Sequence, residues 1–109
     1  MRVFIIRPFG TQENIDFEKV ESDLIQPALK RLRELGVDVA GGTTGEIAAA
    51  GNIREDMFRL IAVSDLVVAD VTIHNANAYY ELGIRHALCP RFTVMIREKN
   101  TKMKYPFDL

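Results

Sequence analysis

The sequence is poor in cysteine, lacks tryptophan and has no long apolar run. Its single cysteine, Cys89, cannot form a disulfide within the chain, which fits a reducing compartment. The N-terminal apolar run Val3–Ile6 is too short for a signal peptide or a membrane span. These absences predict a cytoplasmic protein and argue against the membrane as a partner.

The chain also lacks an excess of charge of either sign. Its 14 Lys and Arg residues nearly balance its 15 Asp and Glu residues, for a net charge of −1. Nucleic acids attract proteins that carry a positive excess, so no nucleic acid is expected as a partner. His74, His86 and Cys89 do not have the spacing of metal ligands, and we expect no metal and no other cofactor.

What the sequence does contain is enough apolar material for one core, 48% of 109 residues. Length and composition are typical of a single domain, which we assign to residues 1–109. The end of the sequence, Tyr105–Leu109, is largely apolar and resembles the start of another element. We therefore expect the parent chain to continue beyond Leu109.

Apolar segments separated by turn signals predict strands that alternate with helices. Strands are expected over 3–6, 37–40, 66–71 and 92–96, and helices over 17–35, 53–62 and 78–88. Four glycines make the stretch 41–51 a loop or a broken helix. The alternation predicts an α/β fold, a flavodoxin-like or Rossmann-like three-layer sandwich. Its parallel sheet should have four or five strands in the order 2-1-3-4.

The first helix has the clearest pattern. Asp16 is placed to cap its start and Gly36 to end it, while Pro27 should kink or interrupt it. Apolar residues at steps of three or four predict one buried face, formed by Phe17, Val20, Leu24, Ala28, Leu32 and Leu35.

Polar residues follow the strand at 66–71, where open α/β sheets build their sites. Asp70 could grip a hydroxyl or orient another group, or it could simply close an Asx turn. Glu81 could attack a sugar carbon or bind ribose hydroxyls. It could equally be a surface glutamate that the helix dipole favours near an N-terminus.

The loops around these acids offer further candidates. Asn75 and Asn77 could bind a ligand, although Asn77 could instead cap the helix expected from Ala78. Arg7, Phe9 and Gly10 follow the first strand and could hold a phosphate or stack on a base, or form an ordinary loop. The run Gly41–Glu46 lacks the Gly-Lys-Ser/Thr ending of a P-loop, which argues against NTPase chemistry.

Several of these segments together resemble a known superfamily. Ala69-Asp70, then Asn75-Ala76-Asn77-Ala78-Tyr79-Tyr80-Glu81-Leu82-Gly83, is similar to the nucleoside 2-deoxyribosyltransferase-like superfamily. The segments Gly45-Glu46-Ile47 and Ala50-Gly51-Asn52-Ile53 extend the pattern toward a bacterial signalling or defence subgroup, distantly similar to TIR-type NAD hydrolases.

This resemblance implies a function and a set of site residues. Glu81 matches the nucleophile that attacks the anomeric carbon. Asp70 lies at the strand end where the family keeps a polar, often acidic, residue on the sugar side, and we count it with Glu81 as catalytic. The implied substrate-binding residues are Arg7, Phe9, Gly10, Asn75, Asn77, Gly45 and Glu46. Asn75 departs from the family, because the transferases often carry an aspartate there.

The expected activity is cleavage or transfer at the N-glycosidic bond of a nucleoside, nucleotide or NAD-like molecule. The alternative is a domain that senses a nucleotide in the same pocket without catalysis. The resemblance also implies a homodimer or other homo-oligomer, and fused or partner signalling domains.

Overall fold

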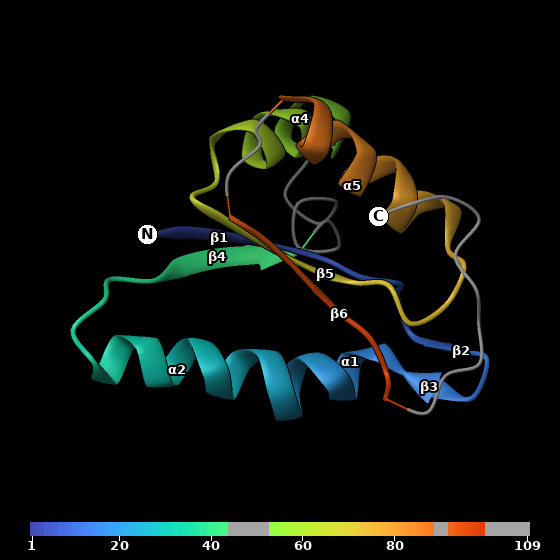
Figure 1. Ribbon diagram of the computed structural model, residues 1–109, viewed down its shortest axis with the longest axis horizontal. Coiled ribbons are helices and arrows are strands. Elements are labelled where there is room, and N and C mark those ends of the chain that lie inside the picture. Colours follow the sequence, from blue (N-terminus) through green and yellow to red (C-terminus); the bar gives the residue numbers. More distant parts are fainter. Residues whose placement is uncertain (44–52, 89–91, 100–109) are drawn as a thin grey trace.

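A parallel sheet with helices on both faces forms the protein, as the computed structural model in Figure 1 shows. The structure describes residues 1–43, 53–88 and 92–99. The strands of the sheet are β1 (Arg2–Ile6), β4 (Ala40–Thr43), β5 (Leu66–Asp70) and β6 (Thr93–Ile96). They pair in the order β4-β1-β5-β6, and every pair is parallel. The predicted mixed α/β class with a parallel sheet is confirmed.

One continuous helical segment covers one face of the sheet, and two helices cover the other (Figure 1). The first consists of α1 (Phe17–Val20), the π-helical turn η1 (Glu21–Ile25) and α2 (Gln26–Glu34). The other face carries α4 (Ile53–Val63) and α5 (Ala76–Leu88).

Strand β1 connects the two halves of the core. Val3 and Ile5 pack with Ile25 and Leu29 on the α2 side. On the other side, the cluster contains Phe4, Ile6, Met57, Ile61, Val67, Ala69, Val71, Ala78 and Leu82. Burial on both faces explains why the run Val3–Ile6 shows no alternation of polar and apolar residues.

The first helix differs from its predicted face beyond Val20. Phe17 is buried as predicted, but Leu24 and Leu35 are 56% and 64% exposed, and Ile25 and Leu29 are buried instead. The cause is η1, because a π-helical turn accommodates one more residue than an α-helical turn and shifts the buried stripe by one position.

Both ends of this helical segment are as predicted. The interruption predicted near Pro27 is present as the π-helical turn η1. Asp16 accepts a hydrogen bond from the Lys19 amide at 3.2 Å, and Gly36 follows the helix with φ +94°. Pro27 is the second residue after η1 and cannot donate a backbone hydrogen bond, which fits the irregular turn before it.

The second predicted strand is wrong in its position. It was expected over 37–40, but β4 is Ala40–Thr43, and its register begins with Arg2 opposite Ala40. Two glycines weaken the local strand propensity, but pairing along the buried strand β1 overrides it. The prediction of a loop is therefore wrong for 41–43, and 44–51 lies outside the described residues.

Helix α5 and a short hairpin complete the site region. α5 begins at Ala76, two residues before the predicted start, and Ala87 is exposed where burial was expected.

Strands β2 (Thr11–Gln12) and β3 (Ile15–Asp16) form an antiparallel hairpin that was not predicted. Glu13 and Asn14 form its tip with φ of 50° and 66°, as a type I′ turn requires.

Candidate functional site

The loops that follow β1 and β5 lie side by side. Ile6 is opposite Ala69 in the parallel register, so the chain leaves β1 after Ile6 and β5 after Asp70 at neighbouring positions. Further out, the Asn75 side chain donates to Gln12 Oε1 at 3.3 Å and connects the second loop to the hairpin. This is the adjacency expected at the carboxyl edge of an open α/β sheet.

Arg7 is engaged with its own neighbours. Its Nε donates to Glu21 at 2.7 Å, Nη2 to Glu18 at 2.5 Å and Nη1 to the Pro8 carbonyl at 2.9 Å. Burial by itself lowers the pKa of Arg7, but the hydrogen bonds with Glu21 and Glu18 outweigh it and raise that pKa. The guanidinium thus attaches the end of β1 to α1 and η1.

Phe9 and Gly10 lie in the same small assembly. The Phe9 ring is exposed, with its centroid 5.7 Å from the Arg7 guanidinium carbon. The Gly10 amide donates to Glu18 at 3.2 Å, and its carbonyl accepts from the Phe17 amide at 2.9 Å. Arg7 and then the Gly10 amide lower the pKa of the Glu18 carboxyl below its ordinary value.

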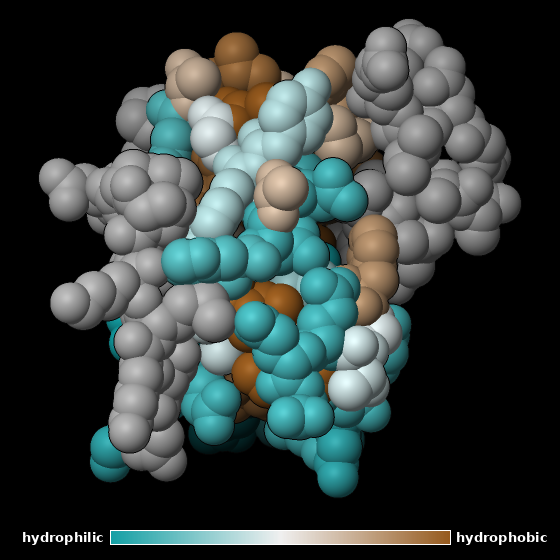
Figure 2. All heavy atoms as spheres, turned by 90° about the vertical axis from the view of Figure 1, so that its right-hand side faces the viewer, coloured by the Kyte–Doolittle hydropathy of each residue, from teal (hydrophilic) through white to brown (hydrophobic). Residues whose placement is uncertain are grey.

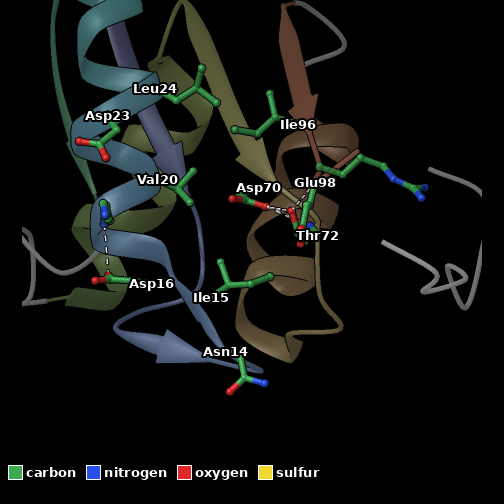
Figure 3. A pocket seen from close by; sticks show the side chains of 12 residues that line it. Asn14, Ile15, Asp16, Val20, Asp23, Leu24, Asp70, Thr72, Ile96 and Glu98 are labelled. Carbon is green, nitrogen blue, oxygen red and sulfur yellow. Dashed lines mark hydrogen bonds between the residues drawn. The ribbon is translucent and has the colours of Figure 1, made fainter. Parts of the chain in front are cut away.

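Asp70 closes a buried turn at the end of β5. Asp70 is only 3% exposed. Its Oδ1 accepts hydrogen bonds from both the amide (3.0 Å) and the hydroxyl (2.7 Å) of Thr72. Thr72 Oγ1 in turn accepts from the Glu98 amide at 2.9 Å, which connects β5 to the segment after β6 (Figure 3). The Asx turn considered from the sequence is therefore present, and it sits at the strand end where a site was expected.

Asn75, rather than Asn77, caps α5. The Asn75 Oδ1 accepts from the Ala78 amide at 2.9 Å, directly before the helix begins at Ala76. Asn77 is exposed in the first turn. The suggestion that Asn77 is the cap is wrong because the helix starts two residues earlier than its apolar pattern indicates.

Glu81 is buried in the second turn of α5. It is 6% exposed and shares the buried face of the helix with Ala78, Leu82 and Arg85. The surface glutamate that the sequence left as an alternative is therefore contradicted, because a carboxylate this buried is not a solvated one.

Arg85 is a buried charge that the sequence reasoning missed. It is fully buried, and its Nη1 donates to the carbonyls of Ile61 (2.7 Å) and Ser64 (2.8 Å) at the end of α4. The sequence did contain a signal for its burial. Arg85 is three residues after Leu82 and seven after Ala78, which places it on the apolar face of the helix.

A cavity of about 610 Å³ opens on the side of the sheet that α1 covers. The ends of β5 and β6 and the segments that follow them contribute Asp70, Thr72, Ile96, Arg97 and Glu98. The hairpin and the helical segment contribute Asn14, Ile15, Asp16, Lys19, Val20, Asp23 and Leu24. Figure 3 shows Val20 and Leu24 directed from the helix toward Ile96 and the strand ends. At this end of the molecule, hydrophilic side chains surround visible apolar atoms (Figure 2).

The structure thus divides the predicted site residues into groups. Asp70 lines this cavity, whereas Glu81 lies on α5 and is not among the described residues that line it. Arg7, Phe9 and Gly10 form the loop beside α1, and Asn75 connects that region to α5. Gly45 and Glu46 lie outside the described residues.

Sequence reasoning also missed Thr72, Glu98 and the cavity wall contributed by α1 and η1. Among the side chains of the described ranges, no group of three or more His, Cys, Asp or Glu is arranged to hold a metal ion. None of the helices within those ranges combines the length and the hydropathy that crossing a membrane requires. Comparison with family models gave no match, and comparison with curated proteins gave none either.

Proposed function

We propose that the chain cleaves or transfers the N-glycosidic bond of a nucleoside, nucleotide or NAD-like molecule at the carboxyl edge of its sheet. The observation that carries this proposal is the burial of Glu81. Glu81 is 6% exposed and interacts with a neighbouring group, so its carboxylate is held in place in the second turn of α5. The resemblance of the segment 69–83 to nucleoside 2-deoxyribosyltransferase-like proteins supports a role as nucleophile. The strand order supports the flavodoxin-like form of the fold as part of the same proposal.

In the proposed reaction, a Glu81 carboxylate oxygen bonds to the anomeric carbon while the bond from that carbon to the base breaks. The base leaves with the bonding electrons and takes up a proton, and the sugar remains as an ester of Glu81. Water or a second base then attacks the same carbon and releases Glu81. Asp70 would orient the sugar, and a homo-oligomer remains part of the proposal.

The test is a base-release assay with deoxynucleosides, nucleoside monophosphates and NAD. We expect Glu81→Gln to abolish release, because the amide is a far weaker nucleophile than the carboxylate. Glu34→Gln, at an exposed position on α2, is the matched control and should release base at the wild-type rate. Release by Glu81→Gln at the wild-type rate would reject the proposed nucleophile.

One observation favours a second candidate, a domain that binds nucleotides without cleaving them. Both polar atoms of the Asn75 side chain already serve structural bonds, Oδ1 to Ala78 and Nδ2 to Gln12. The acidic residue that the transferases often carry is thus replaced by a helix cap. This candidate predicts that a nucleotide raises the melting temperature and that no free base forms.

A further inference from the structure

The cavity on the α1 side shares Asp70 with the proposed reaction, but Glu81 is not among the described residues that line it. It lies between η1 and the ends of β5 and β6, whereas Glu81 belongs to the helix on the opposite face of the sheet. Its volume of about 610 Å³ falls in the range of about 300–1,000 Å³ that is typical of small-molecule sites.

The charge of the lining is negative. Asp16, Asp23, Asp70 and Glu98 contribute four carboxylates, while Lys19 and Arg97 contribute two cations. The Asp70 carboxylate is the most deeply placed of the acids, because its residue is 3% exposed and Thr72 holds Oδ1 in position. Carboxylates held in this way bind cations more strongly than exposed carboxylates do, because less water screens them.

The rest of the wall is apolar. Ile15, Val20, Leu24 and Ile96 line the same cavity, and Figure 3 shows them around the space between helix and strands. Leu24 is 56% exposed because η1 turns it away from the core. An apolar wall next to a buried carboxylate is the arrangement that receives an apolar body with a charged group at one end.

We infer that this cavity binds a small organic cation, an ammonium or guanidinium group attached to an apolar or aromatic body. The cationic group lies at Asp70 and the body lies against Val20, Leu24 and Ile96. The same lining disfavours phosphates and carboxylates, because its four acids outnumber its two cations, Lys19 and Arg97. Arg7, the nearest cation on the loop after β1, is already bonded to Glu18 and Glu21.

Three probes with the same indole body and different charge test this inference. They are tryptamine, which is cationic, tryptophol, which is neutral, and indole-3-acetate, which is anionic. Each is titrated into the ¹⁵N-labelled full chain while amide chemical shifts are followed. We expect tryptamine to shift amides in 14–24, 70–72 and 96–98, with a dissociation constant about tenfold lower than that of tryptophol. Indole-3-acetate should bind most weakly.

Variants locate the site and separate it from the proposed reaction. Leu24→Lys places a cation in the cavity from an exposed position and should abolish tryptamine binding without affecting folding. Leu35→Lys, also exposed and on the same helical segment, is the matched control and should bind as the wild type does. Asp70→Asn should weaken tryptamine binding about tenfold, because the negative charge is lost. If Asp70→Asn folds poorly, Asp23→Asn removes a negative charge from an exposed position in the same lining and serves as the alternative test. Glu81→Gln should retain binding even if the proposed reaction is wrong.

Two results would overturn the inference. One is tryptophol or indole-3-acetate binding as tightly as tryptamine. The other is the absence of shifts in the three named ranges, including the case where none of the probes binds at millimolar concentration.

Discussion

Arg7 shows how one side chain organises the start of the site region. Its guanidinium reaches Glu18 on α1, Glu21 on η1 and the Pro8 carbonyl, so the loop after β1 is attached to the helix that forms the cavity wall. The sequence left open whether this loop holds a phosphate or a base or is an ordinary loop. These hydrogen bonds give Arg7 a structural role, which is to hold the loop against α1 and η1, and this role requires no ligand.

The pairing of Glu18 with Arg7 predicts a dependence of stability on pH. The folded pKa of Glu18 lies below its ordinary value of 4.5, so its contribution is present above pH 4.5 and is lost as the pH falls through the folded pKa. Arg7 has a raised pKa, so it keeps its charge throughout this acidic range. Because Glu18 is largely exposed, the contribution is expected to be about 1 kcal/mol or less.

Thermal melts of Glu18→Gln against the wild type check this dependence. We expect the variant to melt lower at pH 7 and the difference to shrink below pH 4.5. Glu13→Gln, at the exposed hairpin tip, is the control and should change the melting temperature little. A difference that stays constant down to pH 2 would contradict the assignment.

Helix α5 depends on a cap that the sequence pattern places two residues too late. Replacing Asn75 by Ala removes the acceptor for the Ala78 amide and the bond to Gln12. We expect Asn75→Ala to lower the free energy of unfolding by about 1 kcal/mol, the usual cost of losing an N-cap. Urea denaturation followed by circular dichroism measures this change.

Asn77→Ala is the matched control on the same turn. Asn77 is exposed inside the helix, where alanine has the higher helix propensity, so this variant should be neutral or slightly more stable. The reverse ranking of the two variants would show that Asn77 rather than Asn75 caps the helix.

At the scale of the whole molecule, Arg85 joins three elements. From α5 it donates to the Ile61 and Ser64 carbonyls at the end of α4, and its Nε lies 3.4 Å from Thr93 Oγ1 on β6. Arg85→Met should lower the free energy of unfolding by about 3 kcal/mol, because two buried carbonyls lose a charged donor. Arg31→Met, exposed on α2, should change it by less than about 0.5 kcal/mol. Equal chemical denaturation midpoints for Arg85→Met and the wild type would contradict this role.

Much of the fold follows from local pattern. The buried run Val3–Ile6, the cap at Asp16 and the end at Gly36 are properties of neighbouring residues, and the structure agrees with all three. The position of β4 could not be predicted from local pattern, because glycines have low strand propensity. Only pairing with β1 makes this segment a strand.

The sequence by itself determined the alternation of strands and helices and the location of the polar segment after β5. Apolar spacing and turn residues carry that information locally. Only the tertiary structure decided that Leu24 is exposed toward a cavity, that Arg7 is engaged by Glu18 and Glu21, and that Glu81 is buried on the opposite face from that cavity. These outcomes depend on the π-helical turn and on strand register, which bring together residues that are far apart in the sequence.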